Sequence, residues 1–143
     1  MTIKFYKTKE PYGFMSNYFK SRFFVYGRWW TWSEAPYQAA KTNVQSEIEA
    51  IHQATRANDT RLLGQKVTMR PYWDAIKYDV MKEVCLAKFL QHHDLRKELF
   101  ATGDEELVED SPVDYYWGCG ADGTGQNMLG KLLMELREEL KGE

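Results

Sequence analysis

Cysteine and histidine are scarce in this 143-residue sequence, which contains two of the former and three of the latter. Cys85 and Cys119 lie far apart, so we expect no disulfide framework and a reducing, cytoplasmic environment. The histidines show no metal-ligand spacing, and no phosphate-loop or dinucleotide-binding motif is present. We therefore expect chemistry that uses neither a metal ion nor a cofactor.

Long hydrophobic runs and an excess of one charge are also absent. No stretch of about 18 apolar residues occurs, and the N-terminus lacks the apolar segment of a signal peptide, so we expect a soluble intracellular protein without a membrane partner. The net charge of −2 argues against a strong non-specific nucleic-acid binder, which needs a basic face. The length favours one domain over residues 1–143. The sequence leaves the oligomeric state open.

Aromatic residues are abundant, at 15% of the chain with five tryptophans and nine tyrosines. They fit a core and also flat surfaces on which a base or sugar can stack. Residue periodicity predicts a helix-rich α+β domain, in which a small sheet of N-terminal strands packs on about six helices. The expected strands are 2–6, 22–26, 29–31 and 106–109. The expected helices begin at 34, 46, 58, 71, 94 and 126, with Ser33, Ser46, Asn58 and Asp94 as caps and Pro71 at the first position of the longest.

The helix expected from residue 34 carries the first candidate site. At roughly 100° per residue, Glu34, Gln38 and Lys41 share one face, and Tyr37 flanks it. A carboxylate, an amide and an amine are thereby directed at one place. The alternative is an ordinary solvated face. The tryptophans just before this helix favour a site.

Residues 110–125 form the second candidate region, since they break all periodicity. A glycine-dense loop with aromatic side chains and one acid, Asp114, is costly to order, which indicates function. The alternative is a long surface turn. Asn17 likewise is either a turn residue or a polar anchor in a pocket.

Motifs along the whole chain carry a family resemblance. They are Tyr12-Gly13, Ser16-Asn17, Trp30, Ser33-Glu34, Tyr37-Gln38-Ala39, Lys41, Leu63-Gly64, Arg70, Trp73, Ala87-Lys88-Phe89, Asp114-Tyr115-Tyr116-Trp117-Gly118, Gly120 and Asn127-Met128-Leu129-Gly130. On these motifs the chain resembles the NADAR superfamily, the YbiA-like N-glycosidases. Where that family commonly has His-Tyr after the glutamate, this chain has Ala35-Pro36, which bears on substrate choice more than on reaction class.

The resemblance implies hydrolysis of the bond between C1′ of a ribose and nitrogen. The implied substrate is a phosphoribosylamino-pyrimidine intermediate of riboflavin synthesis or an ADP-ribosylated guanine in DNA. Glu34 is the first candidate for the catalytic carboxylate and Asp114 the second. Lys41 either protonates the leaving nitrogen or attacks C1′ to form a Schiff base. Formation of a Schiff base needs a lowered lysine pKa, which burial would favour and the charge of Glu34 would oppose.

The resemblance also implies a set of substrate-binding residues. Aromatic rings would stack on the base or sugar, a guanidinium would bind the phosphate, and other groups would donate or accept hydrogen bonds. The set comprises Asn17, Tyr37, Gln38, Arg70, Trp73, Trp117, Gly118 and Asn127. We expect the pocket between the helix of Glu34 and the loop of Asp114. The alternative function is a module that binds ADP-ribose or a nucleotide without hydrolysing it; the pairing of Glu34 with Lys41 favours the enzyme. A purely structural interaction domain fits the aromatic content but not the glycine-rich loop.

Overall fold

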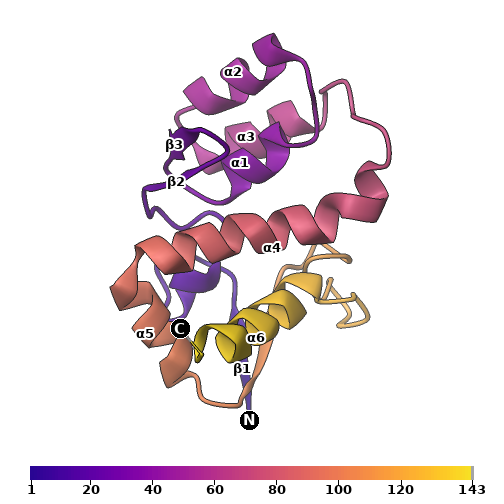
Figure 1. The fold of residues 1–143 in the computed structure, drawn as a ribbon. Helices are drawn as coiled ribbons and strands as arrows, with labels where there is room; N and C mark the ends of the chain where they lie inside the picture. The colour runs from indigo at the N-terminus through magenta and orange to yellow at the C-terminus, as the bar shows by residue number, and fades with distance from the viewer. Residues whose placement is uncertain (143) are drawn as a thin grey trace. The chain divides into compact units, whose positions relative to one another are not determined.

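The computed structural model describes residues 1–142, and its secondary structure is α+β as predicted (Figure 1). The described residues form six α-helices, one short 3-10 helix and four short strands. They divide into two compact units. Residues 20–91 form the central unit, and residues 1–19 form the terminal unit together with the chain from residue 92 onward. None of the helices in residues 1–142 is long and apolar enough to cross a membrane.

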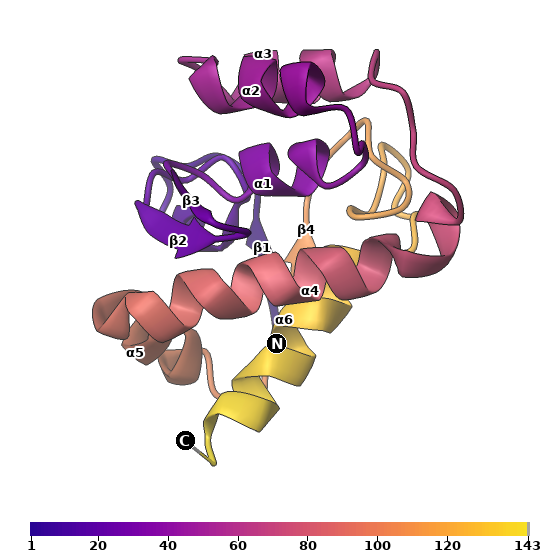
Figure 2. The ribbon, with the colours of Figure 1, turned by 45° about the horizontal axis from the view of Figure 1, so that its top comes forward.

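The central unit is built around a short helix, α1. Its elements are β2 (Phe23–Val25), β3 (Arg28–Trp30), α1 (Glu34–Ala39), α2 (Gln45–Gln53), α3 (Ala57–Gly64) and α4 (Trp73–Gln91). Strands β2 and β3 form an antiparallel hairpin. Within this unit, α2 and α3 lie on one side of α1 and α4 lies on the other (Figure 2). Buried side chains of β3, α1, α2 and the segment between β3 and α1 form one core cluster: Trp30, Trp32, Ala35, Ala39 and Ile51.

The turn between β2 and β3 has two residues with positive φ, and only one of them is a glycine. Tyr26 and Gly27 have φ values of 53° and 77°. Two successive positive φ values match the twist of the flanking strands, as in a type I′ turn. Glycine adopts this conformation freely, whereas tyrosine is strained in it.

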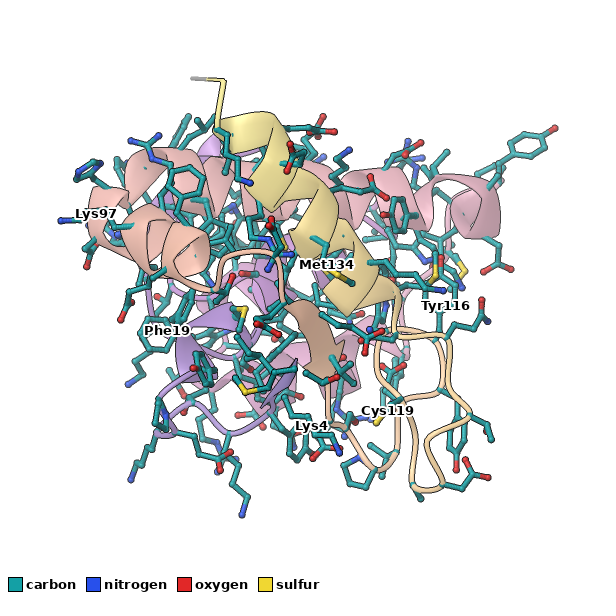
Figure 3. The ribbon with its side chains drawn as sticks, turned by 90° about the horizontal axis from the view of Figure 1, so that it is seen from below. Lys4, Phe19, Lys97, Tyr116, Cys119 and Met134 are labelled. Carbon is teal, nitrogen blue, oxygen red and sulfur yellow. The ribbon has the colours of Figure 1, made fainter. Side chains whose placement is uncertain are left out.

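The terminal unit joins the two ends of the chain through a parallel strand pair. Its elements are β1 (Thr2–Phe5), the 3-10 helix η1 (Gly13–Met15), α5 (His93–Ala101), β4 (Glu106–Glu109) and α6 (Met128–Leu140). Strand β1 pairs with β4 in the register Thr2↔Glu106 to Phe5↔Glu109. Helix α6 packs on β4, and Tyr116 and Cys119 lie in the loop that connects the two (Figure 3). Helix α6 buries a stripe of leucines, each of them at most 2% exposed: Leu129, Leu132, Leu133, Leu136 and Leu140.

The expectation of one sheet made of N-terminal strands is wrong. Strands β2 and β3 pair only with each other, and β1 pairs with β4, about a hundred residues later in the chain. A hairpin follows from a local turn, but a parallel pair requires a long crossover connection whose ends leave no local signal.

Of the four predicted helix caps, only Ser33 lies at the predicted position, and the other three are wrong. Ser33 stands at the N-cap of α1 but has helical φ and ψ and makes no side-chain cap hydrogen bond. Ser46, Asn58 and Asp94 are each the second residue of a helix, after caps that use no side chain. Pro71 lies outside α4, which begins at Trp73 after Tyr72 in the left-handed region (φ 63°). Capping residues lower the cost of a helix end by about 1 kcal/mol, which tertiary packing readily outweighs.

Candidate active site

Five of the predicted site residues lie together in the central unit, and we call them the Glu34 cluster: Glu34, Tyr37, Gln38, Lys41 and Trp73. The Gln38 amide Nε2 donates a hydrogen bond of 2.8 Å to Glu34 Oε1. Glu34 is 9% exposed and Gln38 is 4% exposed. The interpretation of this face as solvated is therefore wrong. The helix instead holds a carboxylate and an amide away from solvent.

A glycine on the neighbouring helix allows this placement of Gln38. A Cβ atom on Gly64 of α3 would collide with the Gln38 side chain. Helix α3 can approach α1 closely because residue 64 has no side chain. The pair Leu63-Gly64 therefore supports the site from behind, although neither residue was predicted to act in it.

Lys41 lies in the turn that follows α1, and a neighbouring segment fixes its backbone. The Arg70 backbone N–H donates to the Lys41 carbonyl oxygen at 2.7 Å. The Lys41 ammonium nitrogen lies 5.8 Å from the centroid of the Tyr37 ring, within the range of a cation–π contact.

Burial lowers the pKa of Lys41 from its ordinary value, and this is the largest effect on it. The negative charge of Glu34 acts in the opposite direction, and the positive charge of Lys77 on α4 lowers the pKa further. The two opposing effects expected from the sequence are thus both present, and burial is the larger. A lysine with a lowered pKa has a larger fraction of neutral, nucleophilic amine near neutral pH.

Two members of the cluster are aromatic, and their rings pack against each other. The rings of Tyr37 and Trp73 lie 5.4 Å apart between centroids, with an angle of 53° between their planes. They are 5% and 4% exposed, respectively. Their packing holds the start of α4 against α1, so Trp73 has a structural task whether or not it also contacts substrate.

The Arg70 side chain lies away from the cluster, although its backbone is bonded to Lys41. This side chain lines a cavity that meets α1 at Pro36, Ala39 and Ala40, on the other face from Glu34. The guanidinium Nη1 donates to the Ala40 carbonyl oxygen at 3.3 Å. No residue of the Glu34 cluster lines this cavity. The structure thus does not bring the Arg70 guanidinium to Glu34.

The remaining predicted residues belong to the terminal unit, where Asp114 orders its loop. Its Oδ1 accepts backbone N–H groups from Tyr116 at 2.9 Å and from Trp117 at 2.7 Å. Trp117 is 9% exposed, and Tyr116 packs edge-on against it with 4.8 Å between ring centroids. One oxygen of the second candidate carboxylate is therefore engaged in holding Trp117 in place.

Gly118 and Asn127 brace the same loop against β4. A Cβ atom on Gly118 would lie 2.9 Å from Ser111 Cβ, so the loop closes tightly there. Asn127 accepts the Glu109 backbone N–H through Oδ1 and donates through Nδ2 to the Leu107 carbonyl oxygen, both at 2.9 Å. Both ends of its amide are engaged with β4. Asn17, which follows η1, is 6% exposed.

Lys88 belongs to a motif of the family resemblance but was not predicted as a site residue, and it is 1% exposed on α4. Burial lowers its pKa to about 8, and its ammonium nitrogen lies 5.3 Å from the centroid of the Phe89 ring. The buried stripe of α4 includes Met81, Val84, Cys85 and Lys88, at spacings of three and four. A lysine does not contribute to an apolar periodicity, so the hydrophobic pattern of this helix gives no signal that Lys88 is buried.

Comparison with known proteins gives a consistent result. Residues 4–141 match the NADAR domain family. N-glycosidase Npun_R5314 of Nostoc punctiforme is 43% identical over 146 residues, covering 99% of this chain and 94% of that protein. N-glycosidase YbiA of Escherichia coli is 39% identical over 140 residues, covering 96% and 88%. The NMR structure of that protein superposes with a TM-score of 0.91 at 38% identity, covering 99% of this chain and 85% of the other. Riboflavin biosynthesis protein VVA0006 of Vibrio vulnificus is 39% identical over 97% of this chain, which spans 38% of that protein.

Proposed function

Because this chain belongs to the NADAR family, we propose that the Glu34 cluster is the place where it hydrolyses an N-glycosidic bond. The chain is an N-glycosidase, as relatives at 39–43% identity are named. We propose a phosphoribosylamino-pyrimidine as its substrate, because a relative that contains a similar region is named a riboflavin biosynthesis protein. The observation that carries the proposal is the buried Glu34 carboxylate beside a lysine whose pKa is lowered.

Glu34 is the proposed catalytic carboxylate. Cleavage of a bond between C1′ and nitrogen builds positive charge on the sugar, and a carboxylate held out of water stabilises that charge strongly. The Gln38 amide fixes one carboxylate oxygen by donation to Oε1. Such an arrangement is fixed before the substrate arrives, so little reorganisation is needed in the transition state.

Lys41 is the proposed nucleophile. Its neutral amine adds to C1′ of the ring-opened sugar, and the nitrogen of the base leaves with a proton. Water then hydrolyses the resulting imine, which releases the sugar and restores the amine. The lowered pKa favours this role because only the neutral amine can add to C1′. If Lys41 only protonates the leaving nitrogen, no covalent intermediate forms.

The other predicted residues enter the proposal in supporting positions. Tyr37 and Trp73 are the aromatic members of the cluster, and their rings pack against each other. Asp114 remains the second candidate carboxylate, and its hydrogen bonds to the Trp117 segment assign it at least the ordering of its own loop. Gly118 and Asn127 support that loop.

Mass spectrometry of products tests the proposal. The purified protein is incubated separately with a phosphoribosylamino-pyrimidine and with an oligonucleotide that carries ADP-ribosylated guanine. Release of the free pyrimidine and a sugar phosphate from the first, absent with Glu34→Gln, supports the proposed substrate. Release of ADP-ribose from the second alone would replace it with the nucleic-acid substrate. Binding of either compound without release of any base would leave a binding module.

A further inference from the structure

The central unit contains a cavity that the proposed reaction does not use. It has a volume of about 380 Å³, and its floor includes Trp30, Pro36 and Ala39. We name it the hairpin cavity because the β2–β3 turn forms one wall. Ligand sites occupy about 300–1,000 Å³, so this volume fits a compound about the size of a mononucleotide.

Helix α1 separates the hairpin cavity from the Glu34 cluster. Pro36, Ala39 and Ala40 line the cavity, whereas Glu34 and Gln38 lie on the other side of the helix and Lys41 lies in the turn that follows it. A residue advances about 100° around a helix, so these two sets point in roughly opposite directions. A compound in the cavity therefore does not occupy the proposed active site.

The charged groups at the cavity differ in how they are paired. Arg28 forms an ion pair of 2.6 Å with Glu49. Glu83 accepts a hydrogen bond from the Tyr26 hydroxyl, which holds the strained turn against α4. The Arg70 guanidinium donates to the Ala40 carbonyl oxygen at 3.3 Å, and within residues 1–142 no carboxylate forms an ion pair with it. Since a guanidinium carries five N–H donors, Arg70 has capacity left for an anion.

We infer that the hairpin cavity is a second ligand site, which takes a planar ring compound bearing one phosphate or carboxylate group. The ring lies over the apolar floor at Trp30 and Pro36, and the anionic group binds the Arg70 guanidinium. The floor provides apolar contact and the guanidinium provides a forked donor pair, so both parts of the ligand are needed for affinity. The inference goes beyond the proposed reaction and does not depend on it.

NMR of the five tryptophan indole N–H groups tests the inference on the whole protein. The probes are uridine monophosphate (ring and phosphate), orotate (ring and carboxylate), uridine (ring only) and ribose 5-phosphate (phosphate only). We expect at least one of the first two to shift the Trp30 resonance and to bind about tenfold tighter than either of the last two, as a charged hydrogen-bonded group contributes. Which of the two binds tighter identifies the anionic group.

Variants on two walls of the cavity complete the test. Arg70→Met is expected to weaken the tighter probe about tenfold, and Val80→Phe is expected to block it by filling the cavity. Arg61→Met is the matched control, because Arg61 bonds to Asn58 on α3, outside the cavity. If Val80→Phe lowers the melting temperature, its effect on binding is not used, and the test rests on Arg70→Met alone. Glu34→Gln must leave probe binding unchanged, which separates this site from the proposed active site.

Three results would overturn the inference. The first is that no probe shifts the Trp30 resonance at millimolar concentration. The second is that the tighter probe binds wild type and Arg70→Met equally well. The third is that a probe shifts the Trp73 resonance but not the Trp30 resonance. The last would mean that the phosphorylated ring binds at the Glu34 cluster instead.

Discussion

The buried Lys88 is expected to make the free energy of unfolding of this protein rise with pH. Its pKa is lowered from 10.5 to about 8, chiefly because burial penalises the charged form. The folded protein therefore releases this proton at a lower pH than the unfolded chain does. Between these two values the unfolded chain binds more protons, so the free energy of unfolding rises with pH.

The size of the effect follows from the shift. A lowering from 10.5 to about 8 corresponds to about 3 kcal/mol of destabilisation when Lys88 is protonated in both states. Between about pH 7.5 and about pH 9.5, roughly 2 kcal/mol of this is relieved. The measurement stays below pH 10 because Tyr26 has the opposite effect on stability above that pH. Burial and the hydrogen bond to Glu83 raise the pKa of Tyr26, so its ionisation in the unfolded chain lowers the free energy of unfolding as the pH rises.

Urea unfolding of wild type and Lys88→Met across this window is the assay. We expect the free energy of unfolding of wild type to rise by about 2 kcal/mol relative to that of Lys88→Met. Lys97→Met is the control, because Lys97 on α5 is exposed (Figure 3) and its replacement removes a lysine without changing the buried surroundings of Lys88. A constant difference between wild type and Lys88→Met would refute the reasoning and would mean that Lys88 keeps its proton throughout.

Four further predictions concern the site. Glu34→Gln should retain the fold and reduce turnover about 10²-fold or more. Product release measures the turnover, and the melting temperature of the variant checks the fold. Turnover within a few-fold of wild type would move the catalytic role to another carboxylate. Lys41→Arg should be inactive, because a guanidinium cannot add to C1′, and borohydride should trap the sugar on the Lys41 tryptic peptide of wild type; an active Lys41→Ala would remove Lys41 from the mechanism. Its lowered pKa further predicts that kcat/KM rises with pH and levels off below pH 10.5. Gly64→Ala should lower the free energy of unfolding by about 1–3 kcal/mol through its collision with Gln38, although this exchange usually stabilises a helix; a more stable variant would contradict the packing described. Trp117→Ala should cost about 3–5 kcal/mol, because the ring is 9% exposed, and an unchanged melting temperature would show that the ring is not part of the core.

Features that arise within one element were predictable from the sequence. The contact between Glu34 and Gln38 follows from a spacing of four residues on a helix. The buried leucine face of α6 follows from its periodicity, and the hairpin follows from a turn that contains glycine. In each case the interacting residues are near neighbours in the chain, so backbone geometry alone brings them together.

Features that depend on distant segments required the tertiary structure. The pairing of β1 with β4, the fit of Gly64 against Gln38 and the position of Arg70 all join residues separated by about 25 or more positions. The burial of Lys88 is of the same kind, because its place on the apolar side of α4 is set by what packs there and not by its own polarity. Thus the sequence by itself determined which residue types stand on one face of α1. Only the tertiary structure decided that burial lowers the pKa of Lys41 and that the Arg70 guanidinium faces the hairpin cavity, because desolvation and contact depend on segments that local periodicity does not describe.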